Sequence, residues 1–127
     1  MLKVIKNKIL INRGDTGILA ISTKNDDGSS YEFKVGDVIR FTITKANDCS
    51  DIIKRKDVIV ENESTEVDIE LLPEDTKIGE IISSPVDYWY EVELNPDTSP
   101  QTIIGYDEKG PKILKLYPEG GDAKWYQ

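Results

Sequence analysis

Short apolar runs broken by polar turns follow one another along the chain, and the clearest run extends from Ser84 to Leu94. Successive side chains of a β-strand point to opposite faces, so this run predicts a strand with one core face and one outer face. The core face holds Tyr88, Tyr90, Val92 and Leu94. The outer face holds Trp89, Glu91 and Glu93.

The same alternation recurs in other short segments, which we predict to be strands: 18–23, 38–45, 58–60, 66–71, 102–105 and 112–117. Their inward positions and those of the first strand give a predicted core of Leu19, Ile21, Ile39, Phe41, Ile43, Val67, Ile69, Leu71, Tyr88, Tyr90, Val92 and Leu94. Residues 73–76 predict one helical turn, because proline suits the first helical position and acidic residues suit the first turn.

Lysines interleave with apolar residues between positions 4 and 12, and this pattern predicts one or two short edge strands. We expect Ile9 to Ile11 and Ile113 to Leu116 to be edges that are open to a strand from a neighbour. Residues 46–56 are mainly polar and predict a connection, with Cys49 in a loop.

Many short strands spaced by about ten residues, without a long helical period, predict the fold class. It is an all-β, immunoglobulin-like antiparallel β-sandwich of about seven to nine strands with one short helical turn. We expect residues 1–118 to form this sandwich and residues 119–127 to form a polar and aromatic tail. Tyr88 begins the candidate sixth strand, where it is either a tyrosine corner or a plain core tyrosine.

The composition excludes several classes of function. Sixteen basic residues against 24 acidic ones give a net charge of −8, which disfavours nucleic acid and anionic membranes as partners. No apolar run approaches the ~20 residues of a membrane helix, and we predict no signal peptide. A single Cys49 and the lack of histidine exclude an internal disulfide, a Ser-His-Asp triad and a histidine-bound metal. A carboxylate pair and an oxygen-ligated cation are not excluded in this way. We nevertheless expect no catalytic residues, no cofactor and no metal.

Two local patterns have both a structural and a functional interpretation. Arg13-Gly14-Asp15 is a tight turn or an integrin-type adhesion motif, and the turn is favoured because three residues recur by chance. Glu66, Asp68 and Glu70 share one face of a predicted strand. Paired carboxylates serve glycosidases, but a flat, solvated face leaves carboxylates equivalent, so we expect no catalysis there.

Four segments occur in an order that resembles a known family: Arg13-Gly14-Asp15-Thr16, Gly36-Asp37-Val38-Ile39, Pro73-Glu74-Asp75-Thr76 and 88–94. Over residues 3–117 they resemble the immunoglobulin-like N-terminal domain of phage baseplate upper proteins, from phages and prophages of Gram-positive bacteria. The segment 78–85 departs from that family because it lacks a compact Pro-Gly turn. The chain also stops at Gln127, so we expect a stand-alone accessory protein or the domain alone.

The resemblance implies a non-enzymatic virion module that is made in the bacterial cytoplasm and docks in the tail baseplate. Its implied partners are other tail or baseplate proteins, and a homo-oligomer is a further possibility. Aromatic residues are common interface anchors, which makes Trp89, Trp125 and Tyr126 the candidate partner-binding residues. The alternative is a ligand-binding sandwich, such as a carbohydrate-binding or adhesin-like module, with Trp89, Tyr106, Trp125 or Tyr126 as a stacking platform.

Overall fold

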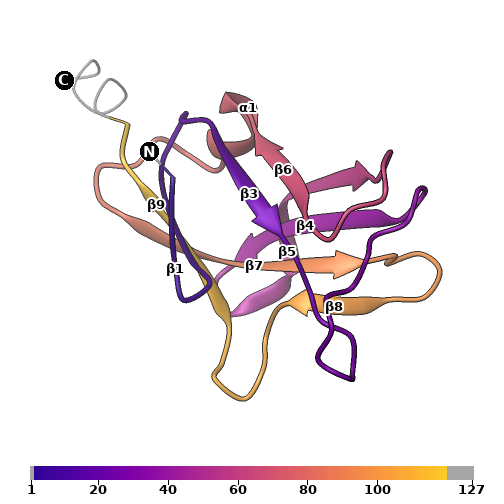
Figure 1. The fold of residues 1–127 in the computed structure, drawn as a ribbon. Helices are drawn as coiled ribbons and strands as arrows, with labels where there is room; N and C mark the ends of the chain where they lie inside the picture. Colours follow the sequence, from indigo (N-terminus) through magenta and orange to yellow (C-terminus); the bar gives the residue numbers. More distant parts are fainter. Residues whose placement is uncertain (1, 120–127) are drawn as a thin grey trace.

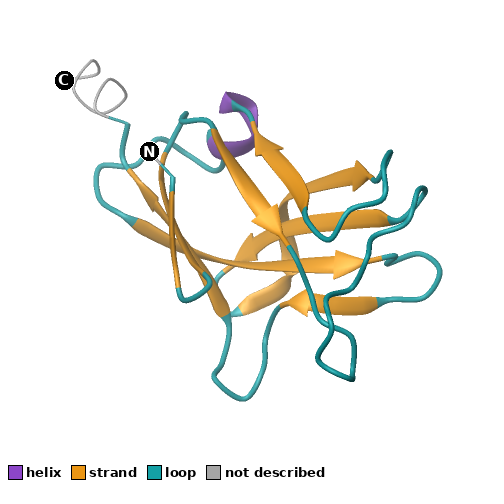
Figure 2. Cartoon of the chain, in the orientation of Figure 1, coloured by secondary structure: helices purple, strands orange, loops and turns teal. Residues whose placement is uncertain are grey.

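A computed structural model describes residues 2–119 of the protein (Figure 1). Nine strands and one helical turn make up this part of the chain, and strands dominate it (Figure 2). In chain order, the elements are β1 (Lys3–Ile5), β2 (Lys8–Asn12), β3 (Gly17–Ile21), β4 (Val38–Lys45), β5 (Asp48–Ile59), β6 (Val67–Leu71), α1 (Pro73–Thr76), β7 (Val86–Leu94), β8 (Gln101–Ile104) and β9 (Lys112–Tyr117).

The strands form two sheets, a large one and a small one. The large sheet has the order β1-β2-β9-β7-β4-β5, and β8 pairs with the second half of β7. The small sheet consists of β3 and β6 and lies across the large sheet (Figure 1). The predicted all-β sandwich is therefore confirmed. It is not wholly antiparallel, because β2 and β9 pair in parallel while the other strand pairs are antiparallel.

The order of the central strands can be compared with that of an immunoglobulin-like sandwich. In such sandwiches strands C, F and G share one sheet, while A, B, E and D form the other. Here β4, β7 and β9 take the positions of C, F and G, and β3 and β6 take those of B and E. Within residues 2–119, no strand of the small sheet takes the position of A beside β3 or of D beside β6.

The prediction that Ile9 to Ile11 and Ile113 to Leu116 form open edges is wrong. Ile9 to Ile11 lie in β2, which pairs with β1 on one side and with β9 on the other. Residues Ile113 to Leu116 lie in β9, between β2 and β7. Neither segment is an edge, because a parallel pairing between the two ends of the chain uses both strands. Among the described residues, β1 and β5 form the edges of the main path.

The prediction that residues 46–56 form a connection is also wrong, since this polar segment forms most of β5. Cys49 is an exposed strand residue and not a loop residue. The first five residues of β5, 48–52, are all exposed, so they show no apolar alternation. β5 pairs with the long strand β4, and a tight turn with Asn47 at φ 66° connects the two strands. The register of this pairing shifts near Thr44.

Eleven of the twelve predicted core residues are buried, and Val67 is half-buried. Alternation alone did not identify the remaining core residues, which are Ile9, Ile11, Phe33, Val60, Ile78, Leu114 and Leu116. Phe33 is fully buried although it lies outside the strands, because its backbone pairs with Ser64 in an isolated bridge. The core therefore extends beneath the loops as well as between the sheets.

The helical turn α1 confirms the prediction for residues 73–76 and ties two distant elements together. Asp75 is buried, accepts a hydrogen bond from the Leu72 N–H at 2.8 Å, and lies 2.6 Å from Lys56 Nζ and 3.3 Å from Lys54 Nζ. Both lysines belong to β5. These contacts fix α1 to the edge of the large sheet. The four residues of α1 are far fewer than a bilayer-spanning helix needs, and no helix of residues 2–119 is long enough.

The Arg-Gly-Asp triplet forms a turn that is held by α1. The Gly14 N–H donates to Thr76 Oγ1 at 3.0 Å, and the same hydroxyl donates to the Asp15 carbonyl at 2.8 Å. Arg13 is 8% exposed. Because an adhesion motif must present its arginine to a receptor, this burial supports the interpretation as a structural turn.

Candidate functional site

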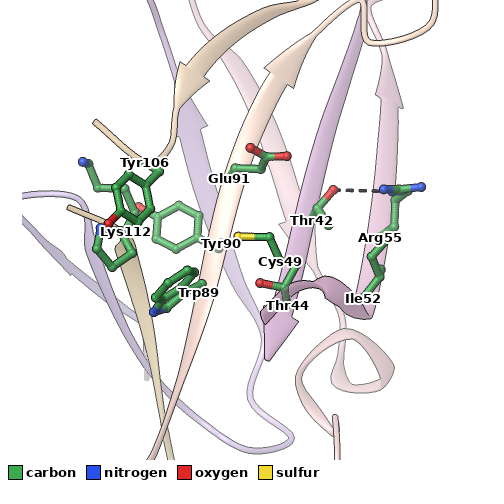
Figure 3. A pocket seen from close by; sticks show the side chains of 11 residues that line it. Thr42, Thr44, Cys49, Ile52, Arg55, Trp89, Tyr90, Glu91, Tyr106 and Lys112 are labelled. Atoms are coloured by element: carbon green, nitrogen blue, oxygen red, sulfur yellow. Dashed lines mark hydrogen bonds between the residues drawn. The ribbon is translucent and has the colours of Figure 1, made fainter. Parts of the chain in front are cut away.

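A pocket lies on the outer face of the large sheet, opposite the face that the small sheet covers. Figure 3 shows the side chains that line it. Its floor comes from β4, its sides come from β5 and β7, and its rim comes from the loop between β8 and β9. The cavity volume is about 90 Å³. Drug-sized ligands usually occupy roughly 300 to 1,000 Å³, so the pocket suits one inserted side chain or part of one sugar ring.

Trp89 and Tyr106 form the aromatic wall of the pocket. Their ring centroids are 5.7 Å apart with an interplanar angle of 66°, an edge-to-face arrangement that aromatic pairs favour. Trp89 is half-buried in β7, whereas Tyr106 is 67% exposed in the loop after β8. A large aromatic surface at this place is therefore available to a ligand or a partner.

Hydroxyl groups from the central strand β4 lie beneath the aromatic wall. Thr42 and Thr44 point to the outer face, because they alternate with Phe41 and Ile43, which belong to the core. Both threonines are buried at the floor. The Arg55 Nε donates a hydrogen bond of 3.5 Å to Thr42 Oγ1, which places a guanidinium group at one side of the pocket.

Glu91 adds a carboxyl group whose protonation is perturbed. Burial raises the pKa of Glu91, and the charge of Glu93 and a hydrogen bond with it raise that pKa further, while Arg55 acts in the opposite direction. Thr42 is opposite Glu91 on one side and opposite Arg55 on the other, so the two charged groups flank a single threonine. The Glu91 carboxyl can therefore accept a hydrogen bond from a ligand at this side of the pocket, and its raised pKa makes it easier to protonate than an exposed glutamate.

Lys112 shapes the loop that presents Tyr106. Its Nζ lies 2.9 Å from Asp107 Oδ1 and donates to the Gly110 carbonyl at 3.4 Å. The hydrogen bond from Lys112 lowers the pKa of the Asp107 carboxyl, with help from the Lys109 N–H. Asp107 and Gly110 also pair through their backbones. These contacts hold the loop in the position that brings Tyr106 to Trp89.

The structure places one of the three predicted partner-binding residues in this pocket. Trp89 lies there, whereas Trp125 and Tyr126 are outside the described residues 2–119. The carboxylates of the predicted acidic stripe lie elsewhere, exposed on the outer face of the small sheet and its approach. Cys49 and Arg55 were not predicted as site residues. Only the pairing of β4 with β5, which no local pattern reveals, brings them beside Trp89.

The described residues of the pocket offer groups that can bind a ligand or a partner. Within residues 2–119, no group of three or more acidic or cysteine side chains is arranged to hold a metal ion. The polar groups of the pocket can form hydrogen bonds and ion pairs, and the aromatic wall can stack against a ligand. No protein-family model, curated protein or solved structure matches this chain.

Proposed function

We propose that the protein is a non-enzymatic structural module of a phage or prophage virion, which docks in the tail baseplate and helps to hold receptor-binding components. The ordered motifs between Arg13 and Leu94 support this proposal through their resemblance to baseplate upper proteins. The immunoglobulin-like strand order is consistent with that resemblance. Its site of action is the virion after synthesis in the bacterial cytoplasm.

The pocket at Trp89 is the observation on which the docking function rests. Aromatic side chains are the commonest anchors of protein interfaces, and such anchors lie centrally with polar groups around them. Here Trp89 and Tyr106 stand beside Thr42, Arg55 and Glu91. The volume of the pocket fits a single side chain of a partner. We therefore assign the outer face of the large sheet as the surface that contacts another tail protein.

Binding measurements with purified tail and baseplate proteins from the same genome test this function. The full chain is expected to bind one of these proteins, and Trp89→Ala is expected to weaken that binding at least tenfold, or about 1.4 kcal/mol. Ile59→Ala is the matched control, because Ile59 is 64% exposed on β5 and does not line the pocket. If none of the tail components binds the full chain, the docking function is wrong.

Carbohydrate binding is a second candidate function, and the composition of the same pocket favours it. A sugar ring can stack on Trp89 or Tyr106 while its hydroxyl groups bond to Glu91 and Arg55. NMR titration with glycans from the cell wall of the host bacterium separates the two functions. Saturable binding that Trp89→Ala abolishes, together with no association with tail proteins, would establish the carbohydrate-binding module.

A further inference from the structure

The small sheet has an open edge along β3. β3 pairs with β6 through five residues, from Gly17 opposite Leu71 to Ile21 opposite Val67. Among residues 2–119, no other strand pairs with β3. This edge is the position that strand A fills in immunoglobulin-like sandwiches, so the N–H and C=O groups of one side of β3 face a place without a strand.

An apolar groove follows this open edge. Its walls include Val4 and Ile9 from the β1–β2 hairpin and Ile18, Leu19 and Ile21 from β3, with a volume of about 300 Å³. Leu2 packs against Gly17, the first residue of β3. Apart from Asn7, the residues that line the groove are apolar or aromatic, and they come from both sheets.

The exposure of Val4 shows that the large sheet extends beyond the small sheet that packs on it. Val4 is directly opposite Ile9, so the two side chains share the inner side of the sheet. Ile9 is 1% exposed, whereas Val4 is 52% exposed. The difference fits a small sheet that, among residues 2–119, ends at β3 and covers β2 more fully than β1. One more strand beside β3 would cover Val4.

The space between the two sheets on the β6 side of the small sheet is lined by different kinds of residue. Near α1, the ion pairs of Lys54 and Lys56 with Asp75 cross from the large sheet to the segment that follows β6. Further along, the groove between β5 and β6 is lined by apolar residues of both strands and also by the carboxylates of Glu61, Glu66 and Asp68. An apolar strand on the β6 side would therefore lie against charged groups. The β3 side is the one where an apolar strand can be buried.

We propose that the edge of β3 binds an extended segment of another polypeptide by strand addition, with alternate apolar residues facing Val4 and the core. Main-chain hydrogen bonds to β3 supply affinity in this mode, and the side chains that enter the groove supply specificity. The inferred surface is distinct from the Trp89 pocket, which lies on the far face of the large sheet. It holds whether or not that pocket docks to a tail protein.

The acidic residues of β6 favour basic side chains on the outward face of the partner strand. Ile18 and Ala20 point outward from β3 and are directly opposite Glu70 and Asp68 of β6. Lysine and arginine can lay an apolar stem over residues such as Ile18 and bring the charged end to a carboxylate. A second copy of this chain is disfavoured, because it would bring the same acidic row and a further charge of −8. The partner segment therefore alternates apolar and basic residues.

NMR titration of the full chain with a heptapeptide of alternating valine and lysine tests the inference. We expect saturable shifts of the amide signals of Gly17–Ile21 and slower hydrogen exchange there. A peptide with glutamate in place of lysine, and one with the same composition in blocks, should each bind at least fivefold more weakly. Equal binding of all three peptides, or shifts confined to β5, would overturn the inference.

Val4 and Ile5 provide a matched pair of variants. Ile5 is 53% exposed, close to the 52% of Val4, but it faces the opposite side of β1 and does not border the groove. Val4→Asn should weaken the valine and lysine peptide at least fivefold, and Ile5→Asn should change it less than twofold. If Val4→Asn lowers the melting temperature strongly, Val4→Thr, which keeps the shape of valine, replaces it. Equal effects at both positions would contradict strand addition at this groove.

Two other occupants of the groove are outcomes of the same experiment. A dimer that Val4→Asn dissociates and Ile5→Asn does not would identify a second copy and overturn the proposed partner. A chain that ends at Glu119 tests the remaining segment, residues 120–127. If that truncation raises peptide affinity tenfold, the chain's own C-terminal segment fills the groove and the proposal of a separate partner is wrong. Unchanged affinity supports it.

Discussion

The hydroxyl oxygen of Tyr88 lies 2.6 Å from the position that a Cβ atom would take on Gly79. Gly79 has a φ of 66° and lies in the connection between α1 and β7. Tyr88 is near the start of β7 and is buried. A tyrosine at the start of this strand that reaches back to the upstream backbone has the location of a tyrosine corner. The contact leaves no room for any side chain at residue 79.

Gly79→Ala should therefore destabilise the protein by about 2 to 5 kcal/mol. A residue with a Cβ costs about 1 to 2 kcal/mol in the left-handed region, and displacing a buried side chain adds ~1 to 3 kcal/mol. Urea denaturation measures the free energy of unfolding. Gly28→Ala is the control, because Gly28 has a φ of 89° and no heavy atom within 4 Å of the added Cβ.

The two glycines separate backbone strain from the contact with Tyr88. If Gly79→Ala and Gly28→Ala destabilise equally, the contact with the Tyr88 hydroxyl has no energetic effect. Tyr88→Phe removes the hydroxyl group and should recover part of the loss when it is combined with Gly79→Ala. A double-mutant cycle gives the coupling free energy of this pair.

The core could be predicted from the sequence because alternation reports burial directly. Every second residue from Tyr88 to Leu94 is buried, and the same holds for Ile39 to Ile43. The edges could not be predicted, since β2 and β9 find each other from opposite ends of the chain. Alternation shows which face of a strand is buried, but it does not show which strand is the neighbour.

The candidate site was predictable only in part, for the same reason. Trp89 could be predicted as a site residue, because the alternation within one strand places it on the outer face. Its neighbour Tyr106 is brought to the pocket by the loop that Lys112 holds. Arg55 and Cys49 are brought there by the register of β5 against β4. That register includes a shift near Thr44, and exposed residues begin the strand. Neither feature has a local sequence signal.

Phe41→Ala should cost about 3 to 5 kcal/mol, which is typical of a fully buried aromatic residue. Phe41 is 1% exposed, and its ring centroid lies 5.8 Å from that of Tyr90. Trp89→Ala is the contrasting variant, because Trp89 is half-buried on the outer face and should lose much less. Chemical denaturation midpoints check both values. Similar midpoints for the two variants would contradict the assignment of inner and outer faces.

Glu91→Gln should stabilise the protein at neutral pH. Burial raises the pKa of Glu91 above that of an unfolded glutamate, and Glu93 raises it further. The folded state therefore binds the proton more strongly than the unfolded state, and the stability of the native protein falls as the pH rises from about 4.3 through the folded pKa. The variant should lack this decrease. Melting temperatures between pH 4 and pH 8 measure it, and parallel curves for both proteins would refute the assignment.

Asp75→Asn should destabilise the protein by about 1 to 3 kcal/mol at pH 7, because it removes the charge that pairs with two lysines. Burial raises the pKa of Asp75, but the hydrogen bond from Lys56, the Leu72 N–H and the charge of Lys56 outweigh it and lower the pKa. The carboxylate thus contributes its stability fully above the unfolded pKa of about 3.9. This contribution is lost as the pH falls toward the folded pKa.

The pH dependence of the Asp75→Asn effect separates charge from shape. Urea denaturation at pH 7 and at pH 2.5 should show that the cost of the substitution shrinks in acid, because below about pH 3.9 the unfolded carboxyl takes up a proton more readily than the native one. Asp97→Asn is the control, since the Asp97 side chain is 76% exposed and its 3.1 Å contact with Arg40 should be worth less than about 1 kcal/mol. A cost of Asp75→Asn that is the same at both pH values would mean that packing alone, and not the ion pairs with Lys54 and Lys56, attaches α1 to β5.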